Sequence, residues 1–270
     1  MSGDPSDMKV VNPDVVPTPL TDAVKEKIAA LALRQHKANG LLMKAVTYVG
    51  GQVEDTMKLL PKSARAQLDE AARSALVQSY DAAAKTRDGV VGRAVQSDRM
   101  HKVMASLSGA LGGAGGLQTA LAEIPVATTM IFRAVQSVEE EYGEDPTTVE
   151  TRVQCLAVFG SGGPGKEDDG IDTSFFGARL GITGAAVNSL ISRVAPRFAT
   201  ILSQKLASQA VPILGAAAGA GTNYAFMQYY VEMAHVHFGL RKLARVHGEE
   251  AVAAAFHVAL VACKVPVIRA

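Results

Sequence analysis

The segment from Leu206 to Val231 contains no charged residue and consists mainly of small side chains. Within it Gly215, Gly219 and Asn223 are spaced four residues apart, so a helix places all three on one face. A helix face without bulky side chains lets a second helix or a hydrocarbon chain approach its backbone closely, and the Asn223 amide can pair with a polar group there. The segment therefore predicts a protein of closely packed helices.

A second uncharged run extends from Val103 to Ala122. Each run is long enough to cross a bilayer, which takes about 20 residues. Both are rich in Gly, Ala, Ser, Thr and Gln, and their flanks carry no aromatic belt or strong excess of positive charge on one side. We therefore expect the central helices of a water-soluble domain in preference to membrane spans.

Charge and cysteine content exclude several classes of protein. The chain has 270 residues, and 27 Lys and Arg nearly balance 26 Asp and Glu, so no global charge favours nucleic acid as a partner. Cys155 and Cys263 are too few for a disulfide framework, which favours the reducing cytoplasm. The segment 1–20 is proline-containing and lacks the apolar core of a secretory signal, so we expect a flexible arm before one helical domain, 21–270.

Apolar residues recur at helical spacing from Thr21 onward, and β-branched runs are sparse, which predicts an all-α fold. Thr21 is placed to cap the first helix and Gly50-Gly51 to end it, and Leu60-Pro61 opens a second. The following helices are expected to begin near Pro125, near Asp145-Pro146 and then at 175–194, 198–209, 213–247 and 249–261.

The helix expected from Pro125 is marked at both of its ends. Pro125 suits a first helical turn, where the helix dipole favours the nearby Glu123 carboxylate. Tyr142-Gly143 marks its end, with Gly143 in the left-handed conformation.

The order and spacing of these elements over most of 61–247 resemble the EcsC family. The matching residues are Gly112, Gly113, Gly115, Gly116, Glu123, Pro125, Tyr142, Gly143, Pro212, Gly215, Gly219, Asn223, Ala234, Phe238 and Arg241. This chain departs from the family pattern at two positions, with Glu123 in place of Asp and Phe238 in place of Tyr. The resemblance implies an all-α domain, found mainly in bacteria, with membrane association or lipid handling and without an established activity.

The loop Gly160 to Lys166 matches the spacing of a phosphate-binding P-loop, G-x-x-x-x-G-K. Glu167, however, stands where a hydroxyl must hold magnesium, and Asp168 and Asp169 would repel a phosphate. We interpret the segment as a surface loop and expect no nucleotide or other cofactor.

Glu232, His235 and His237 form the one metal-ligand pattern of note. A di-iron site needs a second E-x-x-H, which the sequence lacks, so the pattern leaves a mononuclear zinc site or the polar edge of a long helix. Cys155 is a further candidate, as a hydrolase nucleophile, but no neighbouring motif activates it and its apolar surroundings indicate a buried thiol.

The leading hypothesis is a cytoplasmic protein, peripheral on the inner face of a membrane, that binds a lipid or another apolar ligand. Asn223 and Arg241 share one face of a helix but lie about 27 Å apart, so they cannot hold the same head group. Arg241 is the candidate for a phosphate, or alternatively a basic residue that complements the helix dipole. The two rival hypotheses are a metal-dependent or cysteine hydrolase and a structural partner of a membrane transporter complex.

Overall fold

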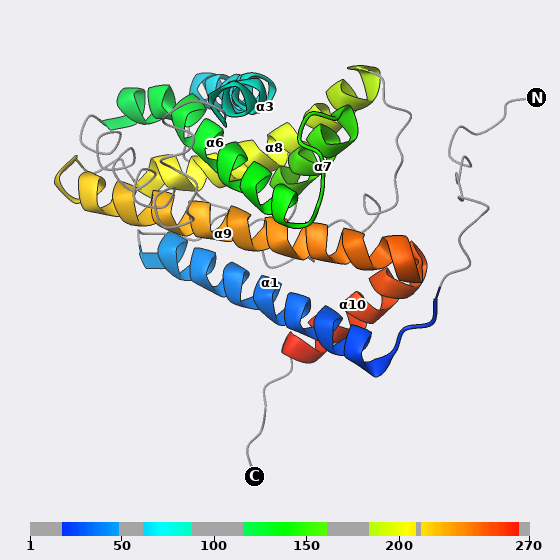
Figure 1. Ribbon diagram of the computed structural model, residues 1–270. Helices are drawn as coiled ribbons and strands as arrows, with labels where there is room; N and C mark the ends of the chain where they lie inside the picture. The colour runs from blue at the N-terminus through cyan, green and yellow to red at the C-terminus, as the bar shows by residue number, and fades with distance from the viewer. Residues whose placement is uncertain (1–17, 49–61, 88–115, 161–183, 209–211, 265–270) are drawn as a thin grey trace, which may run out of the picture.

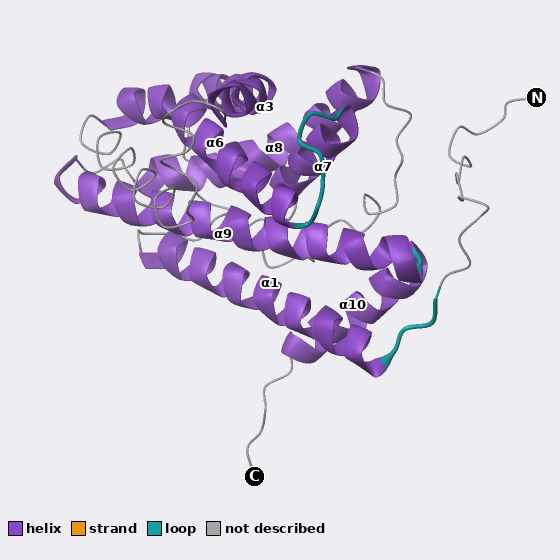
Figure 2. Ribbon diagram, in the orientation of Figure 1, coloured by secondary structure: helices purple, strands orange, loops and turns teal. Residues whose placement is uncertain are grey.

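The computed structural model describes residues 18–48, 62–87, 116–160, 184–208 and 212–264. All regular structure in these ranges is helical, which confirms the all-α prediction (Figure 2). The helices are α1 (Asp22–Tyr48), α3 (Lys62–Arg87), α6 (Gly116–Glu141), α7 (Val149–Gly160), α8 (Gly184–Ser208), α9 (Pro212–His247) and α10 (Glu249–Lys264). None of these described helices is long and apolar enough to cross a bilayer.

Helix α9 is the central element of the bundle. Helices α1 and α10 pack on one side of it, whereas α6, α7 and α8 pack on the other and α3 lies beyond them (Figure 1). Helix α1 runs antiparallel to α9, with Arg34 opposite Glu232 and Leu31 against Gly239. Because α9 is enclosed from both sides, most of its residues from Ala225 to Arg241 are buried.

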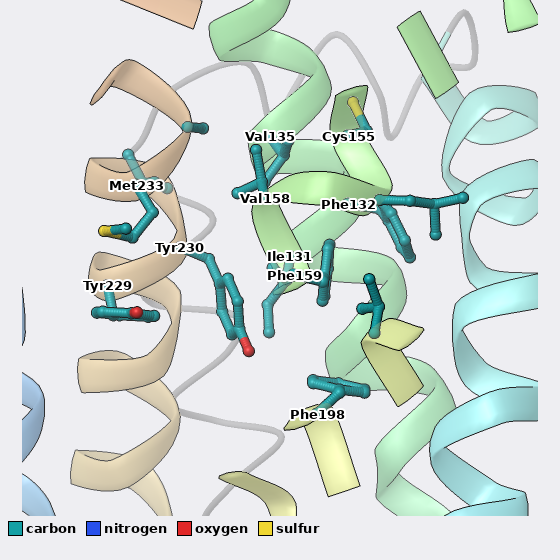
Figure 3. Close-up of a cluster of buried hydrophobic side chains, with 14 of the residues drawn as sticks. Ile131, Phe132, Val135, Cys155, Val158, Phe159, Phe198, Tyr229, Tyr230 and Met233 are labelled. Atoms are coloured by element: carbon teal, nitrogen blue, oxygen red, sulfur yellow. The ribbon is translucent and has the colours of Figure 1, made fainter. Parts of the chain in front are cut away.

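The apolar core is centred on Phe159, near the end of α7 (Figure 3). Its ring centroid lies 4.2 Å from that of Phe132 on α6, 4.8 Å from that of Tyr230 on α9 and 5.4 Å from that of Phe198 on α8. All four rings are buried, and aromatic contacts at these distances add to the stabilisation from area burial. One side chain therefore ties four helices together.

Several helix ends follow the sequence signals. Thr21 caps α1, since its carbonyl accepts from Lys25 N at 3.0 Å. Gly143 ends α6 with φ of 81°, as predicted, and Gly248 separates α9 from α10 with φ of 85°. The start of α7 is a few residues later than the Asp145-Pro146 that the sequence predicts. Thr148 caps this helix, with its Oγ1 accepting from Thr151 N at 3.1 Å.

Two prolines lie inside helices instead of at their ends, which corrects the predicted boundaries. Pro125 is within α6, so the Glu123 carboxylate is not at a helix N-terminus. Pro196 is within α8, so 175–194 and 198–209 are not two helices. In both cases a threonine one turn later donates its hydroxyl to the proline carbonyl, Thr129 at 2.8 Å and Thr200 at 3.0 Å. Burial of α6 and α8 against their neighbours offsets the one backbone hydrogen bond that each proline removes.

Several predicted features lie outside the described residues. These are the arm up to residue 17, the glycine pair 50–51, the uncharged run before residue 116 and the loop 161–183 that contains most of the P-loop-like segment. The last residues of the predicted arm do contact the domain. Thr18 N donates to Val246 O at 3.2 Å, and His247 Nδ1 lies 2.8 Å from Thr18 O.

The contact between α7 and α8 predicts a clear effect of one added methyl group. A Cβ at Gly160 would lie 2.9 Å from Val194 Cγ2, and a valine side chain has little freedom to move away. We expect Gly160→Ala to lower the free energy of unfolding by about 1–3 kcal/mol in denaturant titration. The matched control is Gly221→Ala on α9, where a Cβ meets nothing within 4 Å. This control should stabilise the protein by up to about 1 kcal/mol through helix propensity. Equal effects of the two substitutions would contradict the packing argument.

Candidate functional site

A group of polar and titratable side chains lies where the end of α6, the start of α7 and the second half of α9 meet. We call this group the polar junction. It consists of Glu139, Glu144, Glu150, Gln154, Cys155, His237 and Arg241. The left-handed turn at Gly143 reverses the chain between α6 and α7, and this reversal brings acidic residues of the turn against α9.

Arg241 is the cationic centre of the polar junction. Its side chain is 4% exposed, and its Nε lies 3.3 Å from Glu144 Oε1 while its Nη2 donates to Glu150 Oε1. Glu144 also pairs with Arg245, at 2.7 Å from Nη2, on the surface. A buried guanidinium is stable when carboxylates compensate its charge, and two carboxylates do so here. Carboxylates thus lie beside Arg241 where the phosphate hypothesis expects an anion, and they join α9 to the α6–α7 turn.

His237 lies one turn before Arg241 and is fully buried. Its Nε2 is 2.7 Å from Gln154 Oε1, which joins α9 to α7. Burial, and secondly the positive charge of Arg241, lower the pKa of His237 to about 3. The imidazole is therefore neutral at physiological pH and acts as a hydrogen-bonding partner in the core.

Cys155 is also fully buried, and its Sγ donates to Glu139 Oε2 across the α6–α7 contact. Burial, and secondly the negative charge of Glu139, raise the pKa of the Cys155 thiol well above its usual range. A nucleophilic cysteine needs a lowered pKa and access to a substrate. Cys155 has neither property in this structure, so it serves as a neutral donor.

The candidate metal ligands are not brought together. The Glu232 carboxylate accepts hydrogen bonds from Arg34 Nε of α1 and from Gln228 Nε2, the second at 2.6 Å. His235 lies edge-on to Tyr142, with ring centroids 5.9 Å apart, whereas His237 lies inside the polar junction. Within the described ranges, no group of three or more His, Cys, Asp or Glu side chains could hold a metal ion.

The remaining predicted site residues lie along α9 and α6. Pro212 is the first residue of α9, and Gly215 and Gly219 follow within its first turns. Asn223 is buried in the same helix, far along the axis from Arg241. Glu123 lies within α6, and Pro125 is on its exposed side.

Sequence reasoning missed Glu139, Glu144, Glu150 and Gln154, which contact the buried Cys155 of α7 or the buried His237 and Arg241 of α9. A signal was present in the sequence, because a cluster of glutamates surrounds the Tyr142-Gly143 stop and basic residues, Arg241 among them, gather near the end of the helix expected at 213–247. Pairing them required knowledge that the α6–α7 turn folds onto the end of α9.

The buried ion pairs predict unequal roles for two neighbouring arginines that share Glu144. Arg241→Met leaves two carboxylates without their buried partner and should lower the free energy of unfolding by about 3–5 kcal/mol. Arg245 is 48% exposed, so Arg245→Met should cost no more than about 1 kcal/mol. Urea denaturation of both variants checks this difference, and comparable losses would contradict the internal role of Arg241.

Burial of neutral His237 predicts acid sensitivity. Unfolded histidine binds a proton below pH of about 6.5, whereas folded His237 stays neutral down to about pH 3. The contribution of neutral His237 to the free energy of unfolding is therefore complete above about pH 6.5. It is lost as the pH falls toward 3, at up to about 1.4 kcal/mol per pH unit. Denaturant titrations of the parent and of His237→Gln at neutral and mildly acidic pH measure this effect. The variant should have a smaller fall in stability, and an identical fall in both proteins would contradict the account.

Comparison with known proteins gives a family and no closer relative. A family model described as the EcsC protein family matches residues 13–243. No curated protein and no solved structure matches the chain. The matched range includes α1 to most of α9 and contains Tyr142, Gly143, Asn223 and the Arg241 that centres the polar junction. The chain therefore belongs to the EcsC protein family.

Proposed function

We propose that this protein is a non-catalytic peripheral membrane protein that binds an anionic lipid surface through the outer face of α1, on the cytoplasmic side of a bacterial membrane. One observation carries the proposal. Leu33 and Leu41 are 43% and 40% exposed, and Lys37 lies between them on the same helix face. Leucine side chains left in water beside a lysine are typical of helices that lie in the interface of a bilayer.

The position and charge of α1 fit this role. The helix lies on the opposite side of α9 from α3, so its outer face is not covered by the rest of the described bundle (Figure 1). Basic residues outnumber acidic ones along α1, and Lys27 and His36 are exposed together with Lys37. Each basic residue near an anionic surface contributes about 1 kcal/mol of attraction, and leucine burial adds to it.

The polar junction supports a binding role over a catalytic one. Arg241 is paired with carboxylates, Cys155 is a protonated donor and neutral His237 contacts Gln154. These groups stabilise the helix junction and leave no activated nucleophile in this cluster. The proposal therefore places function on the surface of the bundle.

Vesicle flotation tests the proposal. The protein should float with vesicles that contain about one third phosphatidylglycerol and should be released by salt, whereas phosphatidylcholine vesicles should retain far less of it. Leu33→Ser with Leu41→Ser should weaken binding at least about tenfold, because the apolar contact is lost. Lys37→Glu should weaken binding to the anionic vesicles alone.

The matched control is Val77→Ser with Val126→Ser, which removes two exposed apolar side chains from α3 and α6 on the other side of the bundle. This control should bind vesicles as the parent does. Binding that is unaffected by the leucine substitutions, or that is equal on neutral vesicles, would refute the proposal. Absence of any vesicle binding at low salt would favour a structural partner of a membrane protein complex.

The same experiment addresses the acyl-chain site that the sequence predicts beside Gly215, Gly219 and Asn223. A protein that encloses an acyl chain removes phospholipid from vesicles, so lipid should then appear in the fraction that does not float. A protein that only docks leaves the lipid in the vesicles. Gly219→Leu should abolish extraction and leave flotation unchanged, because it fills the predicted site without altering α1.

A further inference from the structure

Tyr224, on the first half of α9, is the one aromatic residue among the large apolar side chains that are exposed in the described ranges. It is 44% exposed, whereas Phe226, Tyr229 and Tyr230 of the same helix are buried. A tyrosine side chain combines an apolar ring with a polar hydroxyl, and it is enriched at boundaries between an apolar phase and water. Tyr224 is therefore a candidate contact for such a boundary.

Tyr224 and Leu41 lie at the same level of the antiparallel pair formed by α1 and α9. Arg34 of α1 faces Glu232 of α9, which fixes the register of the two helices. Leu41 is seven residues after Arg34, and Tyr224 is eight residues before Glu232. Both residues are therefore about 10–12 Å from this ion pair along the helix axes, in the same direction. Figure 1 shows the end of α1 beside the first half of α9, in agreement with this register.

The two side chains also share the solvent-facing side of this helix pair. The Arg34 and Glu232 side chains are 37% and 19% exposed, so water reaches the boundary between the helices at the ion pair. Leu41 is on the same face of α1 as Arg34, because seven residues make almost two helical turns. On α9, Tyr224, Gln228 and Glu232 follow at four-residue spacing, and Gln228 Nε2 donates to Glu232 Oε1 at 2.6 Å. Leu41 and Tyr224 are therefore open to solvent on the same side of the pair.

This part of the helix pair carries basic residues and no acidic ones. From Lys27 to its end α1 contains no Asp or Glu, and Lys37 is exposed. From Pro212 to Val231 α9 contains no charged residue. An anionic lipid surface attracts a region of this composition, because no carboxylate opposes the lysine.

The opposite end of the helix pair has a different charge. There Lys25 pairs with Asp22 at 3.1 Å and Arg245 pairs with Glu144 at 2.7 Å, so carboxylates neutralise these basic side chains. Two glutamates in the first turn of α10 lie at the same end. An anionic bilayer therefore fits the end with Leu41 and Tyr224 better than it fits this one.

We propose that Tyr224 is an interfacial anchor that enters an anionic bilayer together with Leu41, so that the protein rests on the membrane by this end of the α1–α9 pair. This role rests on the proposed membrane function of α1 and adds to it a residue of α9 and an orientation. The tyrosine ring reaches the acyl boundary while its hydroxyl stays among the head groups. A Cβ at Gly40 or at Gly221 would meet nothing within 4 Å, so the surface next to both side chains is open.

Single tryptophans test the anchor, because the chain contains no tryptophan of its own. Tyr224→Trp and Leu41→Trp are measured in the full chain with vesicles that contain about one third phosphatidylglycerol. Both should shift their fluorescence emission to shorter wavelength and should be quenched by brominated acyl chains, since each indole enters the bilayer. Val246→Trp at the opposite end of α9 and Val77→Trp on α3 replace exposed valines and should show neither change.

The pattern of quenching distinguishes failure of the anchor from failure of the proposed function. Quenching of Leu41→Trp without quenching of Tyr224→Trp would overturn the anchor and leave the membrane function of α1 in place. Quenching of Val246→Trp that equals that of Tyr224→Trp would overturn the orientation. If no variant is quenched and the parent does not float with anionic vesicles, the proposed function is wrong and the anchor with it.

A substitution series measures how much Tyr224 contributes to vesicle affinity. Tyr224→Ser should weaken binding to the anionic vesicles at least about fivefold, because the apolar ring is lost. The salt dependence of binding should match that of the parent, since no charge changes. Tyr224→Trp keeps an amphipathic ring and should bind within about twofold of the parent or more tightly.

The control for this series is Val126→Ser on α6, which removes an exposed valine and should bind as the parent does. Circular dichroism of Tyr224→Ser should match that of the parent, because the side chain lies outside the core. Parent affinity in Tyr224→Ser would overturn the anchor, as would an equal loss of affinity in Val126→Ser.

Discussion

The pairing of one buried guanidinium with two carboxylates constrains the described bundle most strongly. Arg241 is on α9, whereas Glu144 lies in the α6–α7 turn and Glu150 in the first turn of α7. A charge in this position is tolerated when its partners are in place, so the turn has to close onto α9 for the bundle to be stable. The left-handed Gly143 permits this closure, and the His237–Gln154 contact continues it one turn deeper.

This arrangement separates the inside of the molecule from its surfaces in functional terms. The polar groups inside pair with one another between helices, and aromatic contacts around Phe159 fill the space beside them. On the outer face of α1, Leu33 and Leu41 are exposed with Lys37 between them. The interior therefore accounts for the fold, and the outer face of α1 is the surface on which we place the membrane.

The sequence was sufficient for the fold class and for several helix ends, because these depend on local signals. Thr21 and Gly143 act within one helical turn, and their roles follow from residue type. Pro125 also gives a local signal, which predicted a helix start, and the predicted break between 194 and 198 surrounds Pro196. Packing of α6 against α3 and of α8 against α7 overrides those signals, and nothing near either proline in the sequence reveals it.

The candidate site was predicted less completely, since it depends on contacts between distant segments. Arg241 was recognised through the family pattern, but its partners Glu144 and Glu150 precede it by more than 90 residues. In the structure these two carboxylates contact the guanidinium for which the sequence suggested a phosphate. Glu232, His235 and His237 share a short segment but face three different neighbours, because successive residues of a helix point in different directions.

Hydrogen–deuterium exchange of the full chain, with and without anionic vesicles, tests the separation between interior and surface most directly. The account predicts that amides of α9 around His237 and Arg241 exchange slowly and equally in both conditions. It also predicts that vesicles slow the exchange of α1 around Leu33 and Leu41. Exchange that slows at the polar junction while α1 is unaffected would contradict the account, because the ligand would then bind where the structure places internal ion pairs.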